Sequence, residues 1–397
     1  MKRVYLDHSA TTEVHPEVRE AMLPFLGKMS GNPSSLHWFG QEARQAVEDA
    51  REKVAELLGA GPEEIFFTSG GTESDNWVLF GAAEAESQSG HPGGKRNHLI
   101  TSQIEHHAIL HPAEILEKRG YQVNYLEVDR FGRVDPDALE KALTPRTFLV
   151  SIMMANNEVG TIQPVTEIAG RLKGKNIVFH TDAVQAVGKI PVNLKQLPVD
   201  LLSLSAHKFY GPKGMGVLFV RKGTKMPRFI HGGSQEMNLR AGTENVAGMV
   251  GLAQALKIAV RDLEANSLRL RRLQKRLEEG MKQKIADISF NGHPEKTIPG
   301  LTNVSFSYIE GEAILLNLDL QGVAASSGSA CTSRSLDPSH VLKAMGVSPE
   351  QARGSIRFSL GRENTEEEID LVLEILPGII QKLRDMSPIY PGKRNSR

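Results

Sequence analysis

Asn176-Ile-Val-Phe-His-Thr-Asp182 and Asp200-Leu-Leu-Ser-Leu-Ser-Ala-His-Lys208 are the two stretches that decide the fold. Each is a short apolar run that leads directly into polar residues. Similar runs recur between residues 60 and 221, and helical patterns such as His106 to Arg119 and Val165 to Lys173 lie between them. This alternation predicts an α/β fold in which helices cover both faces of a mainly parallel sheet.

The C-terminal part of the chain has a different pattern. Residues 252 to 286 are rich in Leu, Arg, Lys and Glu, and they predict one long helix that bridges two domains. The elements expected after it are strands at 301–306 and 355–360 and helices near 312–318 and 365–384. We therefore expect a large domain of residues 14–260, and a small α+β domain of residues 1–13 and 261–397 that carries the only cysteine.

Composition limits the class of protein. The 397 residues include 47 basic and 47 acidic side chains, and this balance argues against a nonspecific nucleic-acid binder or a basic membrane-surface protein. The single cysteine, Cys331, excludes an intrachain disulfide and a zinc site made of several cysteines. No apolar run suits a signal peptide or a membrane span, so we expect a cytoplasmic enzyme without membrane or nucleic-acid partners.

The segment Phe67-Thr-Ser-Gly-Gly-Thr72 is the first candidate site, because an apolar run ends there before a helical segment. Glycines let a ligand approach the backbone, and the free amides of a helix start attract anions. We therefore predict a phosphate site at Gly71 and Thr72, with a tight turn capped by Thr72 as the alternative. The segment matches neither a P-loop nor the GxGxxG pattern of dinucleotide sites.

Charged residues end two of the predicted strands. Asp182 lies at the edge where open α/β sheets bind ligands, and a protonated pyridine nitrogen would suit it as a partner; a helix-capping role is the alternative. Lys208 ends an apolar run before a Gly-Pro turn. Partial burial would lower its pKa and make its amine nucleophilic, whereas a solvated turn lysine is the alternative and Lys213 is a rival candidate.

Three further residues are candidates of the same kind. Cys331 follows a run of small residues that is unlike a core strand, so a reactive thiol is favoured over a buried, inert one. His106, at a strand-to-helix junction, could stack on a ring or be structural. Arg357 is a single charge in an apolar strand, and its anionic partner is either a substrate carboxylate or an internal acid.

Together these motifs resemble the cysteine desulfurases of the class V aminotransferase type, and within them the NifS/IscS branch. The resemblance covers nearly the whole chain. The motifs that carry it occur in family order: Tyr5-Leu-Asp-His-Ser-Ala-Thr-Thr12, Thr68-Ser-Gly-Gly-Thr-Glu-Ser74, Asn156-Asn-Glu158, His180-Thr-Asp182, Ser205-Ala-His-Lys-Phe-Tyr-Gly211, Arg240-Ala-Gly-Thr-Glu-Asn245, Ser327-Gly-Ser-Ala-Cys331 and Ser355-Ile-Arg-Phe-Ser-Leu-Gly361. It implies fold type I of the pyridoxal 5'-phosphate enzymes and a homodimer.

The resemblance also implies a role for each candidate residue. Lys208 would attach the cofactor, His106 would stack on its ring and move protons, and Cys331 would take the sulfur of L-cysteine as a persulfide, leaving L-alanine. The residues implied to bind the cofactor are Gly71, Thr72, Ser205 and His207 at the phosphate, Asp182 at the ring nitrogen, Gln185 at the ring oxygen, His106, Asn157 and Lys208 around the ring, and Thr243 at the phosphate of the neighbouring subunit. Asn157 and Arg357 would bind the substrate carboxylate.

The implied partner is a sulfur-acceptor protein such as an iron–sulfur scaffold. No metal of the chain's own is implied, although Cys331 would be able to ligate a cluster transiently together with a scaffold. Two rival functions stay open: a selenocysteine lyase or another β-eliminating enzyme of the same fold, and a non-catalytic scaffold. The chain departs from the family pattern at His107, where many members have lysine, and in its C-terminal sequence.

Overall fold

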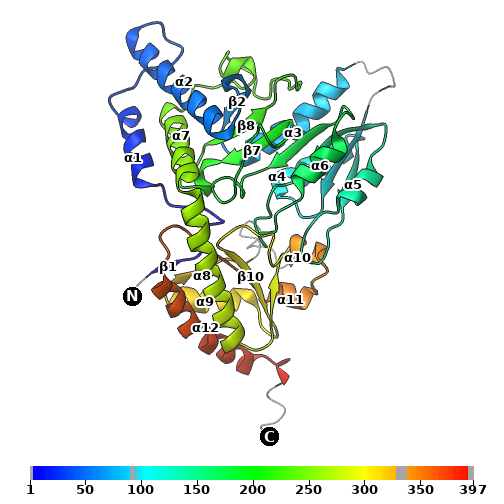
Figure 1. Ribbon diagram of the computed structural model, residues 1–397, viewed down its shortest axis with the longest axis vertical. Coiled ribbons are helices and arrows are strands. Elements are labelled where there is room, and N and C mark those ends of the chain that lie inside the picture. Colours follow the sequence, from blue (N-terminus) through cyan, green and yellow to red (C-terminus); the bar gives the residue numbers. More distant parts are fainter. Residues whose placement is uncertain (1–2, 90–93, 95, 328–337, 392–397) are drawn as a thin grey trace.

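The structure, a computed structural model (Figure 1), describes residues 3–89, 94, 96–327 and 338–391. Its largest element is a seven-stranded sheet with the order β2-β8-β7-β6-β5-β3-β4. The strands are β2 (Ile65–Thr68), β3 (His98–Ser102), β4 (Gln122–Leu126), β5 (Thr147–Ser151), β6 (Val178–Asp182), β7 (Leu201–Ser205) and β8 (Gly216–Val220). Strand β8 is antiparallel to both of its neighbours and the other pairings are parallel, which confirms the predicted mainly parallel sheet.

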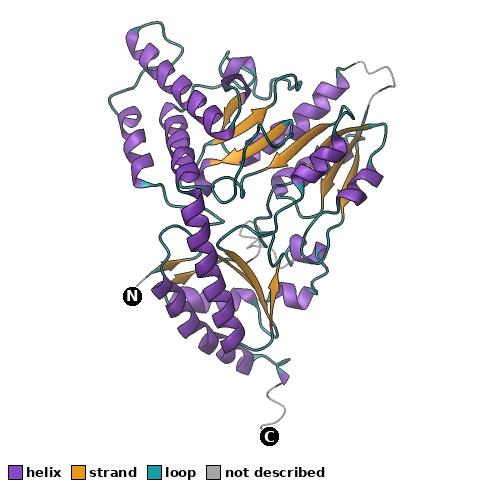
Figure 2. Cartoon of the chain, viewed as in Figure 1, coloured by secondary structure: helices purple, strands orange, loops and turns teal. Residues whose placement is uncertain are grey.

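Helices cover both faces of this sheet (Figure 2). Leu149 and Val150, adjacent on β5, belong to two different core clusters, because successive side chains of a strand point to opposite faces. The helices of the large sheet are α1 (Pro16–Met22), α2 (Trp38–Leu58), α3 (Gly71–Ser87), α4 (His107–Lys118), α5 (Pro136–Ala142), α6 (Val165–Leu172) and α7 (Val246–Arg261), with short 3-10 turns at Leu23–Leu26, Pro62–Glu64, Ala206–Lys208 and Glu236–Asn238.

A second core forms around smaller sheets at the other end of the molecule (Figure 1). Its elements are β1 (Val4–Tyr5), α8 (Leu263–Lys284), β9 (Ile288–Asn291), β10 (Leu301–Phe306), α9 (Gly311–Leu320), β11 (Val323–Ala324), β12 (Ser355–Ser359) and α12 (Glu366–Met386). The short helices α10 (His340–Ala344) and α11 (Pro349–Arg353) pack instead in a separate cluster with Ile104 and Met153. Strands β12, β10 and β9 form an antiparallel sheet, and β1 pairs with β11. This separate core supports the division into domains that we propose, residues 14–260 against 1–13 with 261–397.

The prediction of one helix over residues 252–286 is wrong. Helix α7 begins earlier, at Val246, and Asp262 separates it from α8. Asp262 has a φ of −99° and a ψ of 3°, and its carboxylate accepts a 2.7 Å hydrogen bond from Nε of Arg261. Aspartate is a weak helix former in helix interiors and is common at helix ends, and α7 ends at this residue.

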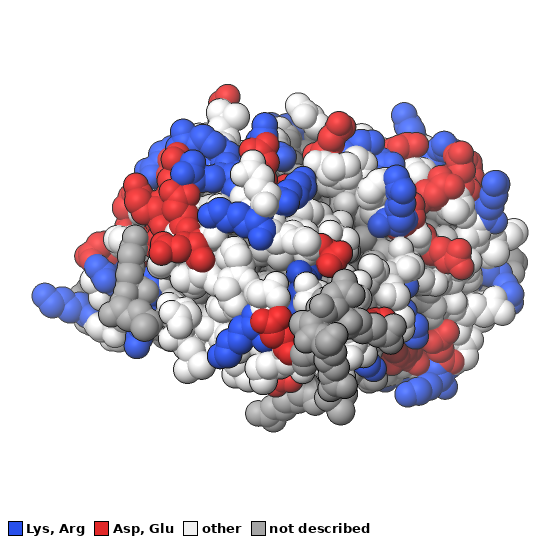
Figure 3. Space-filling view, turned by 90° about the horizontal axis from the view of Figure 1, so that it is seen from below, with Lys and Arg blue, Asp and Glu red and all other residues white. Residues whose placement is uncertain are grey.

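Both signs of charge occur on the end of the molecule that the small domain forms, with a compact group of acidic side chains on the left of Figure 3. Lys and Arg side chains lie beside Asp and Glu side chains over the face in Figure 3. Helices α8 and α12 exchange ion pairs there, such as the one from Arg276 to Asp370 at 2.7 Å. Within the part of the chain that the structure describes, no helix is long and apolar enough to cross a membrane.

Candidate active site

One cavity of about 320 Å³ gathers the predicted site residues at the edge of the large sheet. It is lined by Gly71, Thr72, His106, Asn157, Asp182, Gln185, Ser205, His207, Lys208 and Arg357. Asp182 ends β6 and Ser205 ends the adjacent strand β7, with Lys208 three residues further on. Parallel strands end at the same edge of a sheet, and this is why motifs far apart in sequence meet here.

The start of α3 suits an anion. Gly70 is the N-cap residue, no side chain caps the helix, and the predicted alternative of a Thr72 cap is therefore wrong. A Cβ at Gly71 would lie 2.6 Å from Cγ2 of Val184, so only glycine fits at this first helical position. Free amide groups and the helix dipole favour negative charge at such a position, and Thr72 lines the cavity beside them.

Asp182 combines a structural contact with a place in the cavity. Its Oδ1 accepts a 2.8 Å hydrogen bond from the Val184 amide, which is the capping role left open as an alternative. Burial raises the pKa of Asp182 to about 6, although Lys208 acts in the opposite direction. A cationic ring nitrogen placed against this carboxylate would favour its ionised form.

Behind Asp182 lies a buried polar network that sequence reasoning missed. His180 on β6 contacts Ser151 Oγ at 2.9 Å through Nδ1 and Ser203 Oγ at 3.0 Å through Nε2. Nε2 also lies 3.6 Å from Oδ1 of Asp75, on α3, and burial together with Asp182 raises the pKa of Asp75 well above its usual value. Burial lowers the pKa of His180 to about 3, so its imidazole is neutral at pH 7.

Lys208 lines the same cavity as Asp182. Its Nζ donates 2.7 Å hydrogen bonds to the carbonyl oxygens of Ser9 and Ala10, so a segment near the N-terminus positions the amine. The Nδ1 atom of the neighbouring His207 lies 3.1 Å from the Thr11 hydroxyl. Lys213, the rival candidate, is exposed and does not line this cavity.

His106 and Arg357 also combine structural contacts with cavity positions. Nδ1 of His106 accepts from the Ala108 amide at 3.1 Å and caps α4, so the ring proton of the neutral form is on Nε2. Burial, with Lys208 nearby, lowers the pKa of His106 to about 4. Arg357 donates at 2.9 Å to Asp7 Oδ1 and at 2.9 Å to the Asn157 carbonyl, whereas its buried Nε has no hydrogen-bond partner within the described residues.

Two predicted residues are not part of this cavity as described. Thr243 is exposed and lies outside the lining, and Cys331 lies outside the described residues. Lining residues to which no role had been given are Ser9, Ala10, Asp75, His107, Met153, Ala155, Glu158, Val184 and His340. Asp75 directly follows the Thr68–Ser74 motif and Glu158 ends another quoted motif, so both could have been found from sequence; nothing in the sequence around His340 places it beside β3.

The donor set therefore fits a ligand that is anionic at one end and carries a protonated ring nitrogen at the other. The uncapped start of α3 suits the anion, and the Asp182 carboxylate suits the ring nitrogen. The Lys208 side chain lines the same cavity, whose volume lies in the range of small-molecule pockets.

Comparison with known proteins identifies the family of the chain. A family model described as aminotransferase class-V matches residues 4–372. A curated relative from Dictyoglomus turgidum, named Cysteine desulfurase IscS, is 54% identical over 389 residues, which cover 98% of this chain and 97% of the relative. The solved structure of a NifS-like protein is 43% identical with a TM-score of 0.90, covering 96% of this chain and 100% of that one. Another, of SspA in complex with cysteine, is 36% identical with a TM-score of 0.78, covering 90% and 99%.

The chain belongs to the class V aminotransferase family, with the α/β architecture of the fold type I enzymes. Within that family it is an enzyme of the cysteine desulfurase group, of the IscS and NifS type, and this confirms the resemblance found from its motifs.

Proposed function

We propose that the chain uses pyridoxal 5'-phosphate to remove sulfur from L-cysteine, giving L-alanine and a persulfide on Cys331. The observation that carries the proposal is the convergence of the Lys208 amine and the Asp182 carboxylate on one cavity beside an uncapped helix start. The cysteine-bound relative SspA supports L-cysteine as the substrate.

The cofactor would be held by groups at or just after the ends of five strands of the large sheet, β2, β3, β5, β6 and β7. Gly71, Thr72, Ser205 and His207 would bind the phosphate; Asp182 the ring nitrogen; Gln185 the ring oxygen; His106 and Asn157 would contact the ring; and Lys208 would supply the amine for covalent attachment. Because the His106 imidazole is neutral at pH 7, it can stack on the ring without adding charge. When bound, the cofactor supplies an electron sink that stabilises negative charge at the substrate Cα.

The substrate carboxylate would bind Arg357 and Asn157. The unpartnered Nε of Arg357 supports this, since a buried guanidinium N–H without an acceptor is costly and a carboxylate would satisfy it. The contact with Asp7 then has a structural purpose, because it holds the guanidinium in place for the ligand. The Lys208 amine lines the same cavity, and when it is not attached to the cofactor it would serve as the base for the substrate Cα proton.

Cys331 would act as a thiolate that attacks the substrate sulfur. The bond between the substrate Cβ and sulfur breaks, the new sulfur–sulfur bond makes the persulfide, and Cβ gains a proton as L-alanine forms. The persulfide would pass to an acceptor protein, such as a scaffold for iron–sulfur clusters, and its sulfur remains recoverable by thiols. A cytoplasmic location, suggested by the single cysteine, stays a prediction.

A homodimer would complete the site. Exposed apolar side chains between residues 23 and 39 support an interface there, since Leu36 is 86% exposed and Trp38 60% exposed. Thr243 is exposed and lies outside the cavity of its own chain, a position suited to reach the phosphate in a neighbouring subunit.

The test is mass spectrometry of tryptic peptides after exposure to L-cysteine. The peptide with Cys331 should gain one sulfur, and Cys331→Ser should bind the cofactor normally but produce no alanine from cysteine. A Cys331→Ser variant with full activity would refute the assigned role, and would favour a selenocysteine lyase or another β-eliminating enzyme. Absence of any cofactor binding by the unaltered protein would instead favour a scaffold.

A further inference from the structure

Lys189 is a lysine with no assigned role that lies behind the main cavity. It is half-buried in the turn after β6, and it lines a second, small cavity of about 40 Å³ together with His8 and Lys208. It does not line the main cavity. Ser267 on α8 donates a 3.1 Å hydrogen bond to the Lys189 carbonyl, which helps to fix the turn against the small domain.

The ammonium group of Lys189 is directed at Gln185. Nζ of Lys189 donates a 2.5 Å hydrogen bond to Oε1 of Gln185. On the other side of the carboxamide, Nε2 of Gln185 donates to the Ser9 carbonyl at 2.9 Å. That carbonyl also accepts from Lys208 Nζ at 2.7 Å, so one hydrogen-bond chain joins the two lysines.

This network fixes which end of the Gln185 carboxamide faces each neighbour. The carboxamide has one carbonyl oxygen and one nitrogen with two N–H donors. If it were reversed, its NH₂ group would lie against the Lys189 ammonium and its carbonyl against the Ser9 carbonyl, donor against donor and acceptor against acceptor. In the observed orientation Nε2 keeps one more N–H, which is available to a ligand in the main cavity that Gln185 lines.

The surroundings of Lys189 disfavour a charged side chain at this position. Burial, reinforced by the positive charges of Lys208 and Arg357, lowers the pKa of Lys189 to about 7. An apolar side chain would avoid this penalty, so the contact with Gln185 is the feature that an ammonium group adds at this position.

We propose that Lys189 is a positioning residue that holds the Gln185 carboxamide so that an N–H, and not the carbonyl, meets the ring oxygen of the bound cofactor. The inference rests on the proposed function, because it takes the ligand of the main cavity to be pyridoxal 5'-phosphate. Lys189 acts through Gln185, and its positive charge also lies close to the site where the Lys208 amine joins the cofactor.

The experiment titrates pyridoxal 5'-phosphate into the cofactor-free full-length protein and its variants. Lys189→Met removes the charge and the donor, Lys189→Arg keeps both, and Lys195→Met is the matched control because Lys195 is exposed. The readouts are the dissociation constant of the cofactor, the pH midpoint of its visible absorption band, and the melting temperature of the cofactor-free protein.

Lys189→Met is expected to weaken cofactor binding about tenfold, as the loss of one charge-assisted hydrogen bond does. It should also raise the pH midpoint of the absorption band by about half a unit where that midpoint lies below pH 7, since Lys189, with a pKa of about 7, carries a positive charge there. Lys189→Arg should stay within about threefold of the unaltered protein, and Lys195→Met should match it. If Lys189→Met does not fold, Lys189→Gln provides the uncharged variant.

Unchanged affinity and an unchanged pH midpoint in the uncharged variant would overturn the inference and leave the proposed function intact. Equal losses in Lys189→Met and Lys189→Arg, together with equal falls in melting temperature, would overturn it too, because they would indicate a space-filling role. No cofactor binding by the unaltered protein would overturn both proposals.

Discussion

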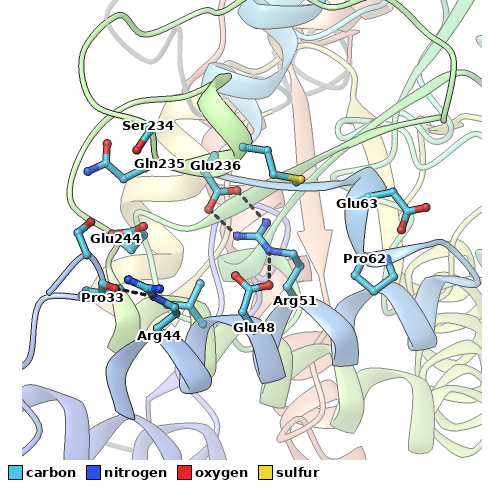
Figure 4. Close-up of a pocket in the computed structure, with 13 residues that line it drawn as sticks. Pro33, Arg44, Glu48, Arg51, Pro62, Glu63, Ser234, Gln235, Glu236 and Glu244 are labelled. Atoms are coloured by element: carbon cyan, nitrogen blue, oxygen red, sulfur yellow. Dashed lines mark hydrogen bonds and ion pairs between the residues drawn. The ribbon is translucent and has the colours of Figure 1, made fainter. Parts of the chain in front are cut away.

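Arg51→Met should destabilise the protein by breaking the buried ion pair that anchors the loop with Thr243. Arg51 is on α2, and Figure 4 shows its guanidinium facing the carboxylate of Glu236. The two groups form hydrogen bonds of 2.8 and 2.9 Å, and their side chains are only 7% and 2% exposed. Glu236 also accepts from the Phe67 amide at 2.7 Å, which ties the loop to β2.

The expected loss in the free energy of unfolding depends on which contacts Glu236 retains when Arg51 is removed. Removing one member of a buried pair costs ~3–5 kcal/mol, because the other charge stays buried without its counter-charge. In Arg51→Met, Glu236 retains the Phe67 amide donor, and the shorter methionine leaves space beside a pocket of about 460 Å³ that both residues line. We therefore expect the lower end, a loss of about 3 kcal/mol in the free energy of unfolding.

The assay is urea unfolding of the cofactor-free protein, followed by circular dichroism. Arg44→Met is the control, because Arg44 is an exposed arginine on the same helix. Glu236→Gln removes the carboxylate charge that Arg51→Met leaves buried without a counter-charge. The loss in the free energy of unfolding of the double variant should therefore be smaller than the sum of the two single losses, by at least about 1 kcal/mol. A loss below about 1 kcal/mol in Arg51→Met, or strict additivity in the cycle, would refute the reasoning.

Two further predictions concern charge and assembly. Burial raises the pKa of Asp182 from 3.8 to about 6, so the folded cofactor-free protein binds this proton more tightly than the unfolded chain does. The protonated carboxyl group therefore stabilises the folded state at low pH, and this stabilisation is lost as the pH rises from 3.8 to about 6. Asp182→Asn should flatten this part of the profile of melting temperature against pH and weaken cofactor binding; an unchanged slope between pH 4 and about 6 would contradict the assignment. For assembly, sedimentation should find a dimer, and Leu36→Glu combined with Trp38→Glu should give monomers, whereas a monomeric unaltered protein would exclude the proposed interface.

The strands of the large sheet were predictable from sequence because each is a short apolar run bounded by turn residues. The run at 216–220 matches β8 in both bounds, and the run at 176–180 is displaced by two residues from β6, since the polar pair Thr181 and Asp182 continues the strand. The apolar pattern alone stops before these polar residues, but the position of Asp182 at the end of the strand was predicted, and the structure confirms it. No prediction was made for α2, although its buried face is one of the most regular in the chain.

The site residues that lie at or just after the ends of strands were predictable from the sequence. Lys208 and Asp182 are separated by 25 intervening residues, but Asp182 ends β6 and Lys208 follows the end of the neighbouring parallel strand β7 by three residues, so sheet topology brings them together. His340 is different, because it lines the cavity through the packing of α10 beside Ile104 and Met153, a contact between the two domains. Packing between domains leaves no local signal in either segment.

Structural and functional roles are not alternatives for the residues of this site. His106 caps α4 through Nδ1 and lines the cavity, and Asp182 holds a turn through Oδ1 and lines the same cavity. Arg357 pairs with Asp7 and keeps Nε unpartnered. A side chain with several polar atoms can use some of them to fix its own position, and a group fixed in this way loses less conformational entropy when a ligand binds. Structural contacts of these residues are therefore what makes them suitable for binding, and Lys189 extends the same principle to Gln185 from outside the cavity.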